Sequence, residues 1–179
     1  MNAPEQDLEA SGPLFPHDLR LWLDEGRLLR LVLDAASSLA AVGTVRTFRH
    51  ASEQFSFGQM LATVGFAYLT GRYGSDAVAE ELEVDPALRY LSVGRFPDPV
   101  VIRRFRRLHR GPLGVVLLRV LRACLDERRR QASQAATDPG LRAGAGVRGD
   151  DMESLSRCAM EAEARLARAV FADTVALDV

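Results

Sequence analysis

Lysine is missing from this chain of 179 residues, and all 23 of its basic residues are arginine. That bias fits a GC-rich coding sequence or a demand for bidentate phosphate binding, so the positions of the arginines carry more information than their number. The formal net charge is −1, so the overall charge of the chain does not indicate an anionic or a cationic partner. Any function that depends on charge must therefore come from local clusters of side chains.

Cysteine is scarce as well, with only Cys124 and Cys158 in the sequence. The two lie far apart, so they provide neither four metal ligands nor a redox-active spacing, and we expect buried free thiols. Met1–Glu9 is polar and acidic, so we expect no secretory leader, and no apolar run is long enough to cross a bilayer. We therefore expect a cytoplasmic protein without membrane contact.

The residues that are present are typical of a soluble, folded protein, because hydrophobic residues make up 47% of the chain and charged residues 26%. The length suits one domain with an appended tail. Proline and glycine positions divide the chain into four parts. These are an extended lead-in (1–16), a helical domain (17–131), a flexible linker rich in Ala, Gly and Ser (132–149), and a C-terminal helix with a short tail (150–179).

Helical periodicity dominates the central part, so we predict an all-α fold, a compact multi-helix domain with helix-turn-helix-like elements. Gln59–Leu69 is almost continuously apolar and predicts a buried core helix, which Gly71 ends in a left-handed cap. Gly26 interrupts the helical pattern near the start of the domain. Arg46–Ser56 is polar and predicts a connection, and Leu113–Gln131 predicts a further helix.

Several positions favour helix ends. Ser75 is a good N-cap, and both Asp85-Pro86 and Asp98-Pro99 combine an acceptor for free amides with a proline at the first helical position. Gly111-Pro112 is expected to stop the helix that begins after Asp98. Asp150 begins the last predicted helix with a capping box.

The helix after Asp98 has the most informative pattern in the chain. On a helical wheel, at about 100° per residue, its apolar side chains gather on one face and its arginines on the other. Such a helix buries one side and presents a cationic ridge that fits the major groove of duplex DNA. The apolar face comprises Val101, Ile102, Phe105 and Leu108, and the predicted DNA-binding residues are Arg103, Arg106, Arg107 and Arg110, with Arg104 at the flank.

A solvated helix face is the alternative interpretation, because any exposed surface carries long charged side chains. No acidic residue lies between Arg103 and Arg122, and an unbalanced run of this length favours a phosphate-binding surface. His109 falls at the apolar edge of the wheel, where we expect a packing residue and not a metal ligand.

Several short motifs between residues 14 and 126 are informative as an ordered combination. They are Leu14-Phe15-Pro16, Leu21-Trp22-Leu23, Tyr68-Leu69-Thr70-Gly71, Ser75, Asp85-Pro86-Ala87-Leu88-Arg89-Tyr90-Leu91, Pro97-Asp98 and Ile102-Arg103-Arg104-Phe105-Arg106-Arg107-Leu108-His109. This order and spacing resemble the N-terminal domain of InsH-type bacterial insertion-sequence transposases. The resemblance implies a helical domain that binds transposon ends during DNA transposition.

Two departures from the family bear on DNA binding. The family commonly has His-Thr-Thr after the Pro-Asp pair, where this chain has Pro99-Val100-Val101 and lacks polar groups that reach DNA. It also tends to have a basic residue where this chain has Asp76. We expect these changes to weaken or abolish DNA affinity, while the Asp98 cap and the apolar helix face retain the fold.

Members of the family transfer DNA strands with three carboxylates on a ribonuclease H-like fold, which hold two Mg²⁺ ions. Their first aspartate ends a short strand similar to Val-Ala-Leu-Asp, and this sequence has Val175-Ala176-Leu177-Asp178 in a tail that favours a strand. Asp178 is either a remnant of that carboxylate or a chance similarity. A lone carboxylate cannot assemble a two-metal site, so we expect no catalytic residues, no cofactor and no activity from this chain alone.

The leading hypothesis is a truncated, transposase-derived domain whose partner is the double-stranded DNA of transposon terminal repeats, either as a decayed remnant or as a retained regulator. The alternative is a helical interaction module that forms a homodimer or inhibits an intact transposase, suggested by the apolar run Val115–Leu121 and the Ala-rich last helix. An independent enzyme ranks lowest, and no small-molecule substrate is expected, because no catalytic grouping or phosphate-binding glycine loop is present.

Overall fold

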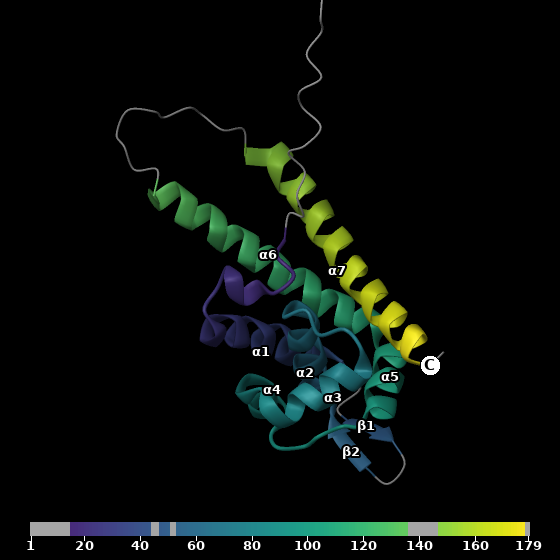
Figure 1. Cartoon of the computed structure of the whole chain (residues 1–179). Coiled ribbons are helices and arrows are strands. Elements are labelled where there is room, and N and C mark those ends of the chain that lie inside the picture. The colour runs from purple at the N-terminus through teal and green to yellow at the C-terminus, as the bar shows by residue number, and fades with distance from the viewer. Residues whose placement is uncertain (1–14, 44–46, 51–52, 136–146, 178–179) are drawn as a thin grey trace, which may run out of the picture.

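A computed structural model describes residues 15–43, 47–50, 53–135 and 147–177, most of which are helical (Figure 1). Two short strands form an antiparallel hairpin. The prediction of an all-α domain is confirmed. The elements in chain order are the 3-10 helix η1 (Leu19–Leu21), α1 (Glu25–Val42), β1 (Thr47–His50), β2 (Glu53–Ser56), α2 (Phe57–Leu69), α3 (Ser75–Val84), α4 (Pro86–Ser92), α5 (Pro99–Leu108), α6 (Arg110–Ala135) and α7 (Val147–Leu177).

The centre of the fold is α2, the core helix that the sequence predicts. Every residue in Met60–Leu69 is buried, and α1, α4 and α6 pack around this helix. Beyond its C-terminus Gly71 has a left-handed φ of 84°, and the Arg72 amide donates to the Ala67 carbonyl at 2.8 Å. A Cβ at position 71 would lie 2.1 Å from Nδ1 of His17, so both the backbone angle and this close approach require glycine.

Two predicted aspartate caps are present. Asp85 accepts hydrogen bonds from the amides of Ala87 and Leu88 at 2.8 and 3.1 Å, and Asp98 accepts from Val101 at 2.8 Å. Proline follows each aspartate at the start of α4 and α5. These caps and prolines fix where both helices begin, and so they position the arginines of α5.

Two other predicted helix starts are wrong. The N-cap of α3 is Gly74, because the Ser75 side chain instead donates to Asp173 of α7 at 2.7 Å. The expected break at Gly26 falls earlier in the chain. Asp24 caps α1 and places Gly26 in the first turn of that helix.

The junction between α5 and α6 also differs from the prediction. α5 ends at Leu108, His109 is its C-cap, and α6 begins at Arg110. Gly111-Pro112 therefore lies in the first turn of α6, which tolerates proline because its amides have no partner within the helix. As a consequence, the arginines on the two sides of His109 belong to different helices.

A hairpin replaces the polar connection predicted over Arg46–Ser56. Phe48 of β1 pairs with Phe55 of β2, and both side chains are buried. The Phe48 ring lies 5.2 Å from that of Phe105 in α5, so the hairpin packs against the helix with the arginines. Strands of four residues with one buried aromatic each contain too little alternation for a strand prediction.

The C-terminal part contains more helix than the sequence predicts. α6 extends to Ala135 and α7 begins at Val147 instead of Asp150, so the predicted linker is shortened at both ends. Residues 136–146 lie outside the described residues. α7 continues to Leu177, which makes the strand prediction for the tail wrong, and it packs along α6 as part of the same hydrophobic core (Figure 1).

Both cysteines are buried and form no disulfide, as predicted. Cys124 lies in α6 and Cys158 in α7, each with 0% exposure. Burial raises the pKa of the Cys124 thiol to about 12. That thiol therefore stays protonated near neutral pH and acts as a small apolar side chain.

Candidate nucleic-acid interface

The five predicted DNA-binding arginines do not form one exposed ridge. Arg106 is buried, with 5% of its surface exposed. Its guanidinium forms an ion pair with the buried Asp173 of α7 at 2.7 Å and donates to the Ala169 carbonyl at 2.8 Å. The prediction that Arg106 faces solvent is therefore wrong. The reason is that α7 contributes these partners on this side of α5, which the sequence of α5 alone cannot reveal.

Arg103 and Arg110 lie nearer the surface and each faces a carboxylate. Arg103 is half-buried, with Nη1 3.5 Å from Oδ2 of Asp76 in α3, and the exposed Arg110 pairs with Glu163 of α7. Both carboxylates are more than half exposed, at 51% and 61%. Exposed pairs contribute at most about 1 kcal/mol, so a stronger anion can displace these carboxylates.

Arg104 and Arg107 are exposed on α5, as predicted. Arg107 makes no hydrogen bond or ion pair within the part of the chain that the structure describes, whereas Arg104 has a partner. Val100, Arg104 and Leu108 follow one another at four-residue spacing and share one side of the helix. Leu108 is 61% exposed, so its predicted place on the buried face is wrong.

His109 is a packing residue, as the sequence predicts. Its ring lies 4.8 Å from that of Phe105, 4.9 Å from Phe57 and 5.8 Å from Phe48. Burial lowers the pKa of His109 below its ordinary value of 6.5, so the neutral ring is favoured. His109 thus joins α5 to the hairpin and α2 without contributing to a cationic surface at neutral pH.

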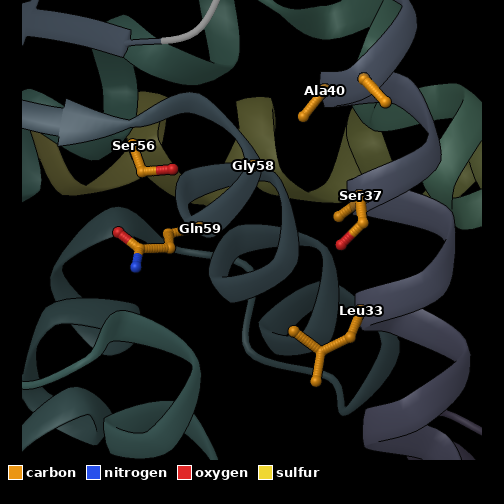
Figure 2. Close-up of a pocket in the computed structure, with 8 residues that line it drawn as sticks. Leu33, Ser37, Ala40, Ser56, Gly58 and Gln59 are labelled. Carbon is orange, nitrogen blue, oxygen red and sulfur yellow. The ribbon is translucent and has the colours of Figure 1, made fainter.

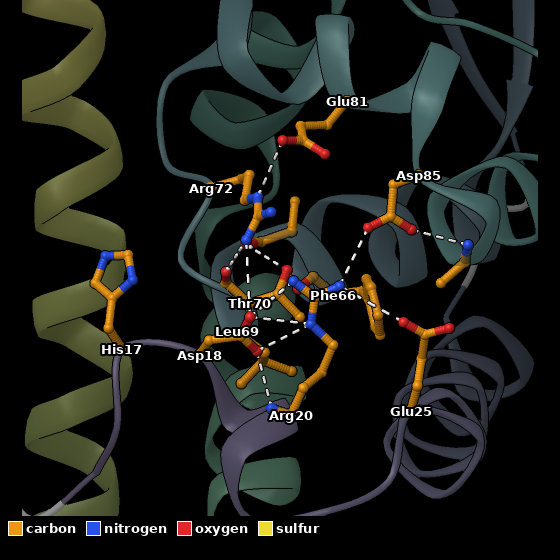
Figure 3. A network of polar contacts seen from close by, with 12 residues as sticks. His17, Asp18, Arg20, Glu25, Phe66, Leu69, Thr70, Arg72, Glu81 and Asp85 are labelled. Atoms are coloured by element: carbon orange, nitrogen blue, oxygen red, sulfur yellow. Dashed lines mark hydrogen bonds and ion pairs between the residues drawn. The ribbon is translucent and has the colours of Figure 1, made fainter.

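Other arginines belong to a polar network where η1, α3 and the ends of α1 and α2 meet (Figure 3). Arg20 pairs with Asp18 at 2.7 Å and with Asp85 at 3.3 Å, and Arg72 pairs with Glu81 at 3.4 Å. Burial alone would raise the pKa of the Asp18 carboxyl, but hydrogen bonds from Arg20 hold it below its ordinary value. Carboxylates outnumber guanidiniums here, so the network stabilises the fold and presents no cationic surface.

Arg165 of α7 is a structural residue that the sequence analysis missed. Its side chain is fully buried and donates to the carbonyls of Tyr68 and Leu69 at 2.8 and 3.0 Å. It also donates to the carbonyls of His17 and Pro16 at 3.1 and 2.6 Å. One guanidinium thereby caps the C-terminus of α2 and fixes the segment before η1.

A signal for the buried polar residues of α7 is present in the sequence. The buried side of the helix repeats every three or four residues, and extending this period beyond Leu166 reaches Asp173. The apolar members of the stripe alone give no sign of Arg165 or Asp173. A charged residue at a stripe position would have indicated a buried ion pair, although not its partner. The buried residues of α7 are Ser154, Cys158, Ala162, Arg165, Leu166, Ala169 and Asp173.

A hollow of about 440 Å³ lies between α1 and the start of α2 (Figure 2). None of the side chains that line it is charged, and histidine and cysteine are absent from them. It therefore offers no acid, base or metal-ligand set. Its lining consists of Leu33, Ala36, Ser37, Ala40, Ala41, Ser56, Gly58 and Gln59.

The described residues contain no group of three or more His, Cys, Asp or Glu side chains that could hold a metal ion. None of the described helices is long and apolar enough to cross a membrane. Asp178, the predicted remnant of a catalytic carboxylate, lies outside the described residues, as do residues 1–14 of the predicted lead-in. The candidate site is therefore formed by the arginines of α5 and of its junction with α6.

Comparisons with known proteins give no match to a family model, to a curated protein or to a solved structure. Gly71 follows the C-terminus of α2, and Asp85 and Asp98 are the N-caps of α4 and α5. The resemblance to InsH-type transposases therefore rests on the ordered motifs of the sequence.

Proposed function

We propose that this chain is a DNA-binding helical module of the kind found at the N-terminus of InsH-type transposases. Its contact with duplex DNA is made by the exposed Arg104 and Arg107 of α5 and by Arg110 at the start of α6. The observation that supports the proposal is the position of Arg107, which is exposed and has no partner within the described residues. A cation left unpaired between two other arginines favours an anionic partner.

The surface pairs around Arg107 are compatible with this function. Asp76 and Glu163 are exposed, so exchanging them for DNA phosphates costs little. Duplex DNA has about one negative charge per 1.7 Å of its axis, a higher density than two carboxylates provide. Phosphate contacts position a protein on DNA without reading its sequence.

Sequence discrimination is expected to be low. Val100 is exposed where the resembling family has a polar residue, and an aliphatic side chain offers no hydrogen bond to a base edge. We therefore expect binding that depends on salt and little on DNA sequence, with a dissociation constant of about 10⁻⁴ to 10⁻⁶ M at physiological salt.

Replacing Arg104 and Arg107 together with alanine is expected to lower DNA affinity about a hundredfold at low salt. The wild-type chain should lose affinity with salt at a logarithmic slope of about −3, one unit per phosphate contact, and the variant should retain a slope of about −1. Fluorescence anisotropy with a labelled duplex of terminal-repeat sequence, titrated at several salt concentrations, measures both quantities.

A matched control is the variant with Arg30 and Arg119 replaced by alanine, because both residues are exposed on other helices and the net charge changes equally. The control should bind like the wild type. Absence of wild-type binding at low salt would remove the DNA-binding proposal. Equal losses in both variants would show that affinity follows net charge and not this site.

A second candidate function, a helical interaction module, is favoured by the outer face of α7. Met152, Met160 and Phe171 are 72%, 70% and 70% exposed, and a helix face with several large apolar side chains in water is typical of an interface. The run Val115–Leu121, which the sequence offered for the same purpose, is buried except for parts of Val115, Leu118 and Arg119. The face of α7 therefore has the more exposed apolar side chains of the two helices in that hypothesis.

Under this second candidate, the occupant is another copy of the chain. Light scattering across a range of concentrations should show a dimer for the wild type and a monomer for Met160→Glu/Phe171→Glu. The matched control is Val84→Glu, at a position 71% exposed on α3. A wild type that is monomeric at every concentration would exclude the homodimer.

A further inference from the structure

We propose that a cavity between α5, the start of α6 and α7 binds a phosphate group. The cavity has a volume of about 140 Å³ and is lined by Arg106, Arg107, Arg110, Leu166 and Val170. By this measure one water molecule needs about 10–15 Å³, so the cavity has room for a phosphate group. Three of the five lining side chains carry a guanidinium.

The positive charge of this cavity exceeds the negative charge that its lining residues contact. Arg106 pairs with Asp173 at 2.7 Å, and Arg110 pairs with Glu163. Arg107 has neither an ion pair nor a hydrogen bond within the described residues. Like charges gathered in this way destabilise the folded state, and an anion bound among them removes that penalty.

The pair between Arg110 and Glu163 indicates how an anion enters. The two side chains are 51% and 61% exposed, so the pair is weak and open to exchange. A phosphate has more acceptor oxygens than a carboxylate and, as a dianion, more charge. It can replace Glu163 at Arg110 while also accepting hydrogen bonds from Arg107.

The remaining wall of the cavity defines the ligand class. Leu166 and Val170 lie one turn apart on α7, and Val170 is 42% exposed. An apolar wall beside guanidiniums suits the carbon side of a phosphate ester, with the oxygens held by the planar arginine forks. The ligand is therefore a phosphate ester, either a free compound or one phosphate of a DNA backbone. Only the DNA form rests on the proposed function.

The test is a titration of the full chain with inorganic phosphate at constant ionic strength, followed by NMR chemical shifts. The wild type should bind saturably with a dissociation constant of about 1 mM. Arg107→Gln should weaken this binding about tenfold, since it removes one charge-assisted contact without breaking a hydrogen bond or ion pair among the described residues. Glu163→Gln should strengthen it several-fold, because the competing carboxylate is lost. Arg119→Gln, at an exposed position on α6 outside the cavity lining, is the matched control.

The same variants titrated with duplex DNA at low salt separate the two proposals. Phosphate binding that depends on Arg107, without DNA binding, supports the cavity and removes the DNA-binding function. DNA binding without saturable phosphate binding overturns the cavity. Phosphate binding that is equal in wild type and Arg107→Gln overturns it as well.

Discussion

Replacing Arg165 with methionine is expected to lower the free energy of unfolding by about 4 kcal/mol, since several hydrogen bonds from a buried charged donor are lost and each contributes about 1.5–3 kcal/mol. The side chain is fully buried and donates to four backbone carbonyls. Methionine fills part of the space but has no donor, so the four carbonyls lose the hydrogen bonds from the guanidinium. Its ion pair with Glu161 at 2.8 Å is lost as well.

Urea denaturation followed by circular dichroism measures this loss. With a denaturant dependence of about 2 kcal/mol per M, the midpoint should fall by roughly 2 M. Arg165→Lys should be intermediate, because an ammonium keeps the charge but not the planar fork of donors. Arg168→Met is the matched control on the same helix, where the side chain is 46% exposed, and it should cost less than about 1 kcal/mol. Equal losses at positions 165 and 168 would contradict the structural role assigned to Arg165.

The parts of the fold that the sequence predicts correctly depend on local signals. An aspartate followed by proline specifies a helix start through its own side chain and its own backbone, so the caps at Asp85 and Asp98 need no distant partner. The same holds for Gly71, whose φ only glycine adopts without strain. The core helix around Phe66 was predictable because a segment that is apolar on all sides can only be buried.

The errors occur where a distant segment decides the outcome. Serine is a typical N-cap residue, yet the amide and the hydroxyl of Ser75 both donate hydrogen bonds to Asp173, 98 positions away. α7 begins at Val147, three residues before the capping pattern at Asp150, and no local signal at Val147 indicates this start. Local propensity is a weak guide at such positions because tertiary contacts override it.

In the candidate site, too, the features set by local sequence were predicted and those set by a distant segment were not. A helical wheel identifies which residues of α5 share a face, and it placed Arg104 and Arg107 at the surface correctly. It contains no information about which neighbour covers each face. α7 covers the side that includes Arg106, and no pattern within α5 indicates this. A wheel for α7, with Asp173 included in its buried stripe, would have indicated a buried carboxylate that needs a cation.

The second large effect is expected at the buried ion pair between Arg106 and Asp173. Asp173 accepts from the Ser75 amide at 2.6 Å, the Ser75 hydroxyl at 2.7 Å and Arg106 at 2.7 Å. Asp173→Leu should therefore cost about 3–5 kcal/mol, because a buried guanidinium keeps its charge without a counter-ion. Arg106→Met should cost less, since the carboxylate retains two donors from Ser75.

The double variant Arg106→Met/Asp173→Leu distinguishes a charge effect from a simple loss of packing. Replacing both partners with apolar side chains removes the uncompensated charge, so the double variant should be more stable than the sum of the two single losses by about 2 kcal/mol. Urea denaturation of the four proteins gives this coupling energy directly. Additive losses, within about 0.5 kcal/mol, would mean that the two side chains act independently. In that case α7 would be held in place by its apolar stripe and by the contacts of Arg165 with the end of α2 and the segment before η1, with no contribution from this ion pair.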